Sequence, residues 1–124
     1  MRPYARRLAS SPGGKTYCCG VGSAPACSGP DWTPLSFAFS ADARHVAVHI
    51  TIDGAASACE GEAVQVDGKA VAFPNLAKKG DCLGDTVRST GALTGDLQVS
   101  YDAGRDVVLL EVDSEGVDET LGVC

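Results

Sequence analysis

The stretch LSFAFSADARHVAVHITIDG, from Leu35 to Gly54, decides the fold class of this 124-residue chain. In its first part, Leu35, Phe37 and Phe39 alternate with Ser and Ala, so the large apolar side chains share one face of a strand. A turn at residues 41–43 leads to a second alternating part. Its apolar face consists of Val46, Val48, Ile50 and Ile52, and its polar face of His45, His49, Thr51 and Asp53. This pattern predicts an antiparallel hairpin with one face on the core.

The next segment predicts a second hairpin. Asp53 and Gly54 end the preceding strand, and a third strand is expected over residues 58–66, with Val64 and Val66 inward. Asp67 and Gly68 supply the positive φ angles that a two-residue hairpin turn needs. A fourth strand then contains Val71 and Phe73, and Pro74 ends it.

A short helix is expected over residues 80–87. Asp81 is a suitable N-cap, and Leu83 and Val87 lie four residues apart on one helix face. Gly84 weakens a helix by about 1 kcal/mol relative to Ala, so we expect only one or two turns. Further strands are expected over residues 97–101, 108–112 and 117–124, with Leu110 and Val112 in the core.

The predicted fold class is mainly β. About seven short strands form an antiparallel meander, with one short helix between the fourth and fifth strands. The sheet either curls over the helix or forms a small sandwich. Residues 10–34 are rich in Gly, Pro, Ser and Cys and are interpreted as a loop.

Six cysteines indicate a disulfide framework, which is typical of an oxidising compartment. They are Cys18, Cys19, Cys27, Cys59, Cys82 and Cys124. Adjacent cysteines rarely satisfy disulfide geometry with each other. We therefore expect Cys59 to pair with Cys82, one of Cys18 and Cys19 to pair with Cys124, and the other to pair with Cys27. An extracellular or secretory-lumen location follows as the expectation.

The charge distribution argues against nucleic-acid binding. The net charge is −6, and four of the ten basic residues lie in residues 1–15, which contain no acid.

Residues 1–14 lack the apolar core of a signal peptide and are interpreted as a basic flexible tail or the remnant of an incomplete N-terminus. Residues 15–124 are then a single domain. The sequence contains no run of 18 apolar residues, so no transmembrane segment is predicted.

Motifs that suggest chemistry have simpler explanations. Residues 14–16 end like a phosphate-binding loop, but its first glycine position is Ala9 and no strand precedes it. His45 and His49 lie about 13 Å apart on a strand, too far to share one metal ion. The acidic run near the C-terminus lacks EF-hand spacing, so a solvated hairpin tip is expected, with weak calcium binding as the alternative. It consists of Glu111, Asp113, Glu115, Asp118 and Glu119.

Trp32 is the one candidate binding residue. It follows a loop that contains three cysteines and several prolines, so the loop can present a rigid aromatic side chain to a partner. The alternative is that Trp32 covers an open end of the core. The sequence does not separate these two roles.

The function predicted from these observations is that of a non-catalytic secreted or surface module. It binds a protein, a glycan or a small apolar ligand, or serves as a structural unit; no enzymatic activity, cofactor or metal is expected. The alternative is a secreted hydrolase, or an inhibitor of one that acts through the loop before Trp32. A pocket lined by Phe37, Phe39 and Phe73 would favour a ligand carrier, whereas a packed interior with an exposed Trp32 would favour a protein-binding module.

Overall fold

A computed structural model describes residues 11–22, 24–29 and 32–124. Its strands are β1 (Thr16–Cys19), β2 (Leu35–Phe39), β3 (His45–Ile52), β4 (Ala55–Ala63), β5 (Gln65–Asp67), β6 (Ala70–Ala72), β7 (Leu97–Asp102), β8 (Val107–Val112) and β9 (Val117–Val123). The helices are α2 (Cys82–Ser89) and two short 3-10 turns, η1 (Thr94–Asp96) and η2 (Asp113–Glu115).

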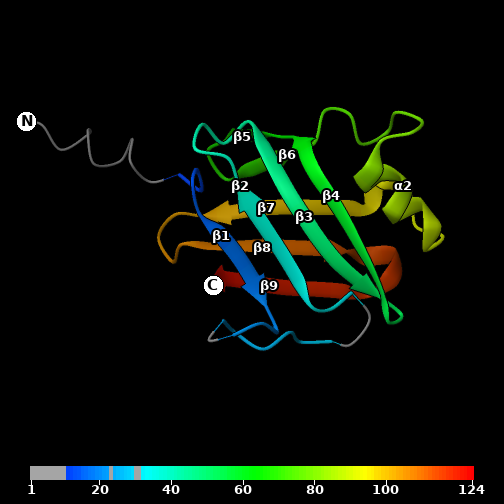
Figure 1. Cartoon of the computed structure of the whole chain (residues 1–124), viewed down its shortest axis with the longest axis horizontal. Coiled ribbons are helices and arrows are strands. Elements are labelled where there is room, and N and C mark those ends of the chain that lie inside the picture. Colours follow the sequence, from blue (N-terminus) through cyan, green and yellow to red (C-terminus); the bar gives the residue numbers. More distant parts are fainter. Residues whose placement is uncertain (1–10, 23, 30–31) are drawn as a thin grey trace, which may run out of the picture.

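The strands form one antiparallel sheet in the order β4-β3-β2-β1-β9-β8-β7-β6-β5. Figure 1 shows that this sheet is folded into two layers: β1 to β4 slant across the front, and β7, β8 and β9 cross behind them. β1 connects the layers because it pairs with β2 on one side and with β9 on the other. The core therefore lies between two halves of a single sheet, and α2 lies beside β4 at one end.

The core contains the apolar faces that the alternation predicts. Phe37, Phe39, Val48, Ile50, Leu110 and Val112 are all buried. His45, His49 and Asp53 are exposed, as expected. Phe37 packs against the rings of Phe39 and Phe73, with centroid distances of 6.4 Å to each. These contacts confirm the predicted phase of β2 and β3.

The fold class is confirmed, with nine strands in the described ranges rather than seven. One additional strand is β1, which the sequence analysis placed in a loop; it is only four residues long and includes two of the cysteines. The other arises because the predicted third strand is divided at Val64 into β4 and β5. The turn of the β5–β6 hairpin is also shifted by one residue, since Asp67 pairs with Ala70 and Gly68 has the positive φ of 61°.

The helix α2 begins as predicted. The Asp81 side chain caps it by accepting a hydrogen bond of 2.9 Å from the Gly84 N–H. Leu83 and Val87 are buried against the sheet. Gly84 has a packing role that the sequence did not reveal, because a Cβ there would lie 2.0 Å from the Leu76 carbonyl oxygen. The glycine thus allows the helix to approach the preceding loop closely.

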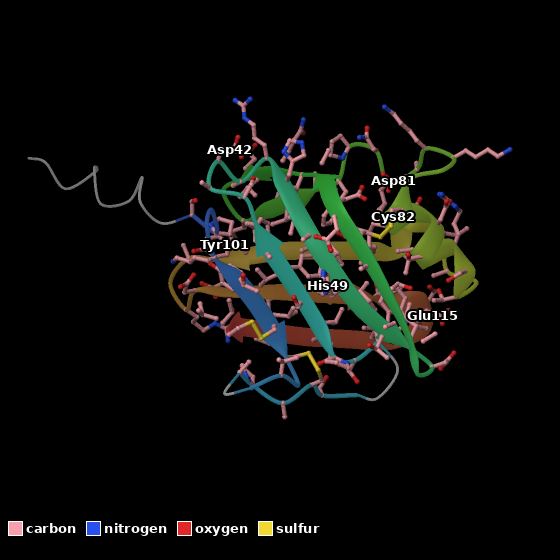
Figure 2. The ribbon with its side chains drawn as sticks, in the orientation of Figure 1. Asp42, His49, Asp81, Cys82, Tyr101 and Glu115 are labelled. Atoms are coloured by element: carbon pink, nitrogen blue, oxygen red, sulfur yellow. A yellow bond between two sulfur atoms is a disulfide. The ribbon has the colours of Figure 1, made fainter. Side chains whose placement is uncertain are left out.

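Three disulfides pair the cysteines as predicted. Cys59 is bonded to Cys82 and joins β4 to the start of α2. Cys18 is bonded to Cys124, and Cys19 to Cys27. The first pair connects β1 to the C-terminal residue, and the second closes a loop of the N-terminal part of the chain. The disulfides therefore lie at both ends of the two-layered structure (Figure 2).

The boundary expected after Gly14 is moved toward the N-terminus. Residues 1–10 of the predicted tail lie outside the described residues. Pro12 is fully buried, and the Gly14 N–H donates a 2.9 Å hydrogen bond to the Ser40 carbonyl. Residues 11–14 are therefore part of the domain. Over the described ranges, no helix has the length and apolar character required to cross a bilayer.

Candidate functional site

A mainly apolar groove lies around His49 on the surface. It has a volume of about 400 Å³ and opens on the outer face of the front layer. It is lined by Val21, Pro34, Leu35, Ser36, His49, Ile50, Thr51, Ala56, Ser57 and Ala58. We call these residues the His49 groove. They come from the Cys19–Cys27 loop and from β2, β3 and β4, so four segments converge on one site.

His49 forms one polar contact in the groove. Its Nε2 atom lies 2.7 Å from Oε2 of Glu60, and both side chains are exposed. Figure 2 shows His49 in the middle of the front layer. Ser36 lies opposite His49 in the β2–β3 register, but within the described ranges the imidazole has no hydrogen bond to a hydroxyl or thiol group. The pair therefore provides a polar anchor for a ligand rather than an assembled nucleophile and base.

The strand beside this groove, β4, is the last strand of the sheet, and no strand of the described residues pairs with its outer edge. The edge has two different halves. Over residues 55–58 it consists of Ala55, Ala56, Ser57 and Ala58, all small and uncharged. Beyond them, a register shift opposite β3 accompanies Gly61, which has a φ of 74°, and α2 is bonded to the strand through Cys59. Only the first half is open.

The structure places Trp32 in the core, where only 2 % of its surface is exposed. The ring therefore covers the core, which is the second of the two roles considered from the sequence, and it is not presented to a partner. The loop before it instead exposes Val21, which lines the His49 groove. The small recess beside Trp32, of about 130 Å³, is lined mainly by the backbone and side chains of residues 28–29 and 116–119.

Glu119 holds this loop in place. The residue is buried, with 3 % of its surface exposed. Its carboxylate accepts hydrogen bonds from the Ser28 N–H at 2.6 Å and the Gly29 N–H at 3.0 Å. The expectation that Glu119 belongs to a solvated tip is thus wrong, because it lies on the inward face of β9 with Val117 and Leu121. Glu119 also lies near the sulfur atoms of Cys19 and Cys27, but these form a disulfide and cannot act as thiolate ligands.

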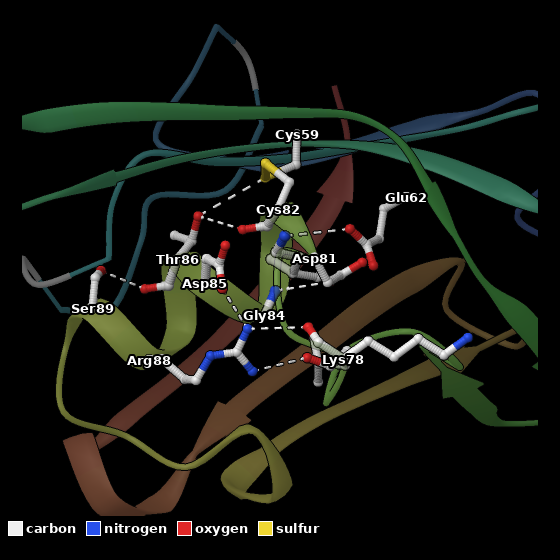
Figure 3. Close-up of polar contacts among 12 residues, drawn as sticks. Cys59, Glu62, Lys78, Asp81, Cys82, Gly84, Asp85, Thr86, Arg88 and Ser89 are labelled. Atoms are coloured by element: carbon white, nitrogen blue, oxygen red, sulfur yellow. Dashed lines mark hydrogen bonds and ion pairs between the residues drawn. A yellow bond between two sulfur atoms is a disulfide. The ribbon is translucent and has the colours of Figure 1, made fainter.

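A second buried carboxyl, Glu62, lies beside the start of α2 (Figure 3). It is 5 % exposed, and its Oε1 atom accepts a 3.3 Å hydrogen bond from the Leu83 N–H. Burial, together with the nearby Asp81 carboxylate, raises the pKa of Glu62 to about 7. A proton on Glu62 removes the repulsion between its carboxyl and the Asp81 carboxylate.

A third polar cluster joins the front layer to the β7–β8 turn. Asp106 accepts hydrogen bonds from the Tyr17 hydroxyl at 2.7 Å, the Tyr101 hydroxyl at 3.0 Å and the Lys15 ammonium group at 3.0 Å. Burial opposes ionisation, but these donors outweigh it and lower the pKa of Asp106. Burial and the contact with Asp106 raise the pKa of Tyr17. All three donors to Asp106 thus come from the protein itself, which indicates a structural role for this carboxylate.

Sequence reasoning missed Glu62 and placed Glu119 in a solvated acidic run, although a signal for burial existed for both. Each lies two residues before a buried apolar residue in an alternating segment: Glu62 before Val64, and Glu119 before Leu121. The groove itself was not predicted, because it forms from segments that are distant in the sequence. Residues 14–16, considered for phosphate binding, lie in a turn and the start of β1 rather than before a helix.

Comparisons of the chain with protein-family models, with curated proteins and with solved structures found no match. The geometry of the groove and the edge strand is therefore the basis for assigning a function.

Proposed function

We propose that the protein is a non-catalytic extracellular binding module and that it binds a segment of a partner protein in the His49 groove. The observation that carries this proposal is the groove itself, which has a volume of about 400 Å³ and a mainly apolar lining that also contains hydroxyl groups and the His49–Glu60 pair. A few polar groups in an otherwise apolar recess are typical of binding sites, where they fix the orientation of the ligand. Three disulfides support the extracellular location.

A polypeptide fits this groove better than the other ligands considered. Small apolar ligands are usually enclosed by their pockets, whereas this groove is open on the face of a sheet. A carrier of such a ligand needs an internal cavity, but here Phe37 is fully buried and packs against Phe73. A glycan site would be expected to offer a large aromatic surface, but Trp32 is buried and His49 is the one aromatic side chain among the described lining residues of the groove.

The proposal is tested with a display library of random peptides selected against the immobilised, oxidised protein. Selected peptides are then measured against two variants. Ser36→Trp fills the groove, because Ser36 lies in its lining and opposite His49. Ala38→Trp is the matched control: Ala38 is the next outward residue of β2, lies opposite Ala47, and is outside the groove lining.

We expect the library to yield binders whose affinity falls at least tenfold for Ser36→Trp and stays unchanged for Ala38→Trp, which corresponds to a loss of about 1.4 kcal/mol or more. Equal melting temperatures of the two variants exclude unfolding as the cause. A library without enriched peptides, or peptides that bind Ser36→Trp as well as the parent, would contradict the proposal.

A further inference from the structure

We infer that the partner segment binds in an extended conformation as an additional strand on the free edge of β4, along residues 55–58, with side chains in the His49 groove. This inference rests on the proposed function and specifies the mode of binding. It also specifies the chemistry of the segment: small or β-branched apolar residues flanked by Lys or Arg.

The backbone of β4 offers hydrogen bonds at this edge. The Thr51 N–H donates to the Pro34 carbonyl and so points toward β2, away from β4. Thr51 lies opposite Ala56, and His49 lies opposite Ala58. In an antiparallel ladder, the peptide groups of both members of such a pair point away from each other. The N–H and C=O groups of Ala56, and the N–H of Ala58, therefore point out of the sheet.

These groups face solvent along a short stretch. Within the described part of the chain, no backbone hydrogen bond reaches Ala56 or Ala58 from outside the sheet. The edge is covered from the Ala58 carbonyl oxygen onward, since the Cys82 sulfur lies 3.6 Å from this oxygen. Edge strands are usually protected against pairing by charges, prolines or bulges. Here residues 55–58 have none of these, whereas the helix, the disulfide and Gly61 lie immediately beyond them.

The side chains beside the edge leave room for the added strand. Ala56 and Ala58 lie on the outer face, and both are in the groove lining. Neighbouring strands are about 4.8 Å apart, so a larger side chain on an added strand can extend over these two methyl groups toward His49. The edge thus supplies the backbone contacts and the groove supplies the side-chain contacts, as in other cases of strand addition.

The charges select a basic segment and disfavour a second copy of this chain. Asp53 lies in the turn before the open edge, and Glu60 lies beyond its other end; both are exposed. Lys or Arg at the ends of a bound segment would meet these carboxylates. If two copies paired antiparallel about Ser57, Glu60 of each copy would lie beside Gly54 and close to Asp53 of the other. The net charge of −6 on each chain adds to that repulsion.

The test measures amide hydrogen exchange by NMR on the oxidised full chain, without and with a synthetic peptide in millimolar excess. The peptide has alternating Val and Thr residues with a Lys at each end. We expect exchange of the Ala56 and Ala58 N–H groups to slow by about tenfold or more when the peptide is bound, because they become hydrogen-bonded. The Ser57 N–H, which faces β3, should change little. A peptide with Glu at both ends should protect these groups less.

Two variants separate backbone pairing from side-chain contact. Ala56→Pro removes an N–H that the internal sheet does not use, a change that edge strands tolerate. Ala56→Val retains this N–H and is the matched control. We expect the Lys-flanked peptide to lose at least tenfold in affinity for Ala56→Pro and much less for Ala56→Val.

Lack of protection at Ala56 and Ala58 in the parent protein overturns strand addition, whether or not the peptide binds. If library-selected peptides bind the groove and depend on Ser36 without protecting these amides, the proposed function stands and strand addition fails. Equal protection by the Glu-flanked peptide overturns the assignment of a basic segment. Concentration-dependent dimerisation of the free protein through this edge would identify a second copy as the occupant and overturn the inference.

Discussion

Glu62 and Asp81 face each other across the junction of β4 and α2, and both bind the first turn of the helix: Glu62 accepts from the Leu83 N–H and Asp81 from the Gly84 N–H. Within the described residues, Oε2 of Glu62 is buried and has no hydrogen-bond partner. The Cys59–Cys82 disulfide also joins the start of the helix to β4. Two adjacent carboxyls thus bind the first turn of α2, and Asp81 is the N-cap residue.

This pair predicts that folding stability falls as the pH rises from about 4.5 to about 7. The folded-state pKa of Glu62, about 7, lies above its ordinary value near 4.5, so the folded protein binds the proton more tightly than the unfolded chain. Stability is therefore lost across this interval and is constant above it, with a total of about 3 kcal/mol from this group. Glu62→Gln should remove this dependence and be the more stable protein at pH 8.

Urea unfolding of the parent and Glu62→Gln at a series of pH values measures this effect, and the difference between the two proteins cancels the contributions of other groups. Glu60→Gln is the control, since Glu60 is on the same strand but exposed. Parallel pH profiles of the parent and Glu62→Gln would show that the carboxyl at Glu62 does not carry the proton.

Glu119 is expected to stabilise the Cys19–Cys27 loop. Glu119→Gln replaces one of the two acceptor oxygens by an amide NH₂ group, so the N–H groups of Ser28 and Gly29 can no longer both be accepted. It also removes the charge that strengthens these hydrogen bonds. We expect a loss of about 1.5 to 3 kcal/mol in the free energy of unfolding. Asp118→Asn, at the exposed neighbouring position, should change it by less than about 0.5 kcal/mol. Equal unfolding curves for the two variants would refute this role.

Gly84 is expected to be required despite its poor helix propensity. Ala would gain about 1 kcal/mol of propensity in an exposed helix, but its Cβ would collide with the Leu76 carbonyl. Gly84→Ala should therefore lower the melting temperature. Gly95→Ala is the comparison, because no atom lies within 4 Å of a Cβ built there. An unchanged or higher melting temperature of Gly84→Ala would show that the loop at Leu76 yields.

Phe37 and His49 test the phase of the front layer. Phe37→Ala should cost about 3 to 5 kcal/mol, because it removes a fully buried ring that packs against two others. His49→Ala should change stability little, since its pair with Glu60 is exposed. Thermal unfolding compares both with the parent. Similar melting temperatures for all three proteins would contradict the assignment of inner and outer faces.

The sequence was sufficient for the regular parts of this fold because alternation and turn residues are local signals. The hairpin of β2 and β3, the Asp81 cap and the disulfide pairing all followed from spacing and residue type. β1 was missed because four residues are too few for a clear alternation, and it becomes a strand by pairing with β2 and β9.

The candidate site was not predictable in the same way. The His49 groove is assembled by β2, β3, β4 and a disulfide-closed loop, and its depth depends on how these segments pack. The open edge of β4 depends on sheet order, which the sequence left undetermined. The role of Trp32 was also left open by the sequence, because a tryptophan can contact either a partner or the core. Its burial in the structure separates these two roles.

The most direct test of the binding account is chemical-shift mapping of the isotopically labelled protein with a peptide selected from the random library. The account predicts the largest shifts at Ser36, His49, Thr51, Ala56 and Ala58, which all line the groove. Largest shifts at Trp32 and residues 28–29, or at the acidic turn of residues 111–118, would contradict it and place the binding surface elsewhere on the domain.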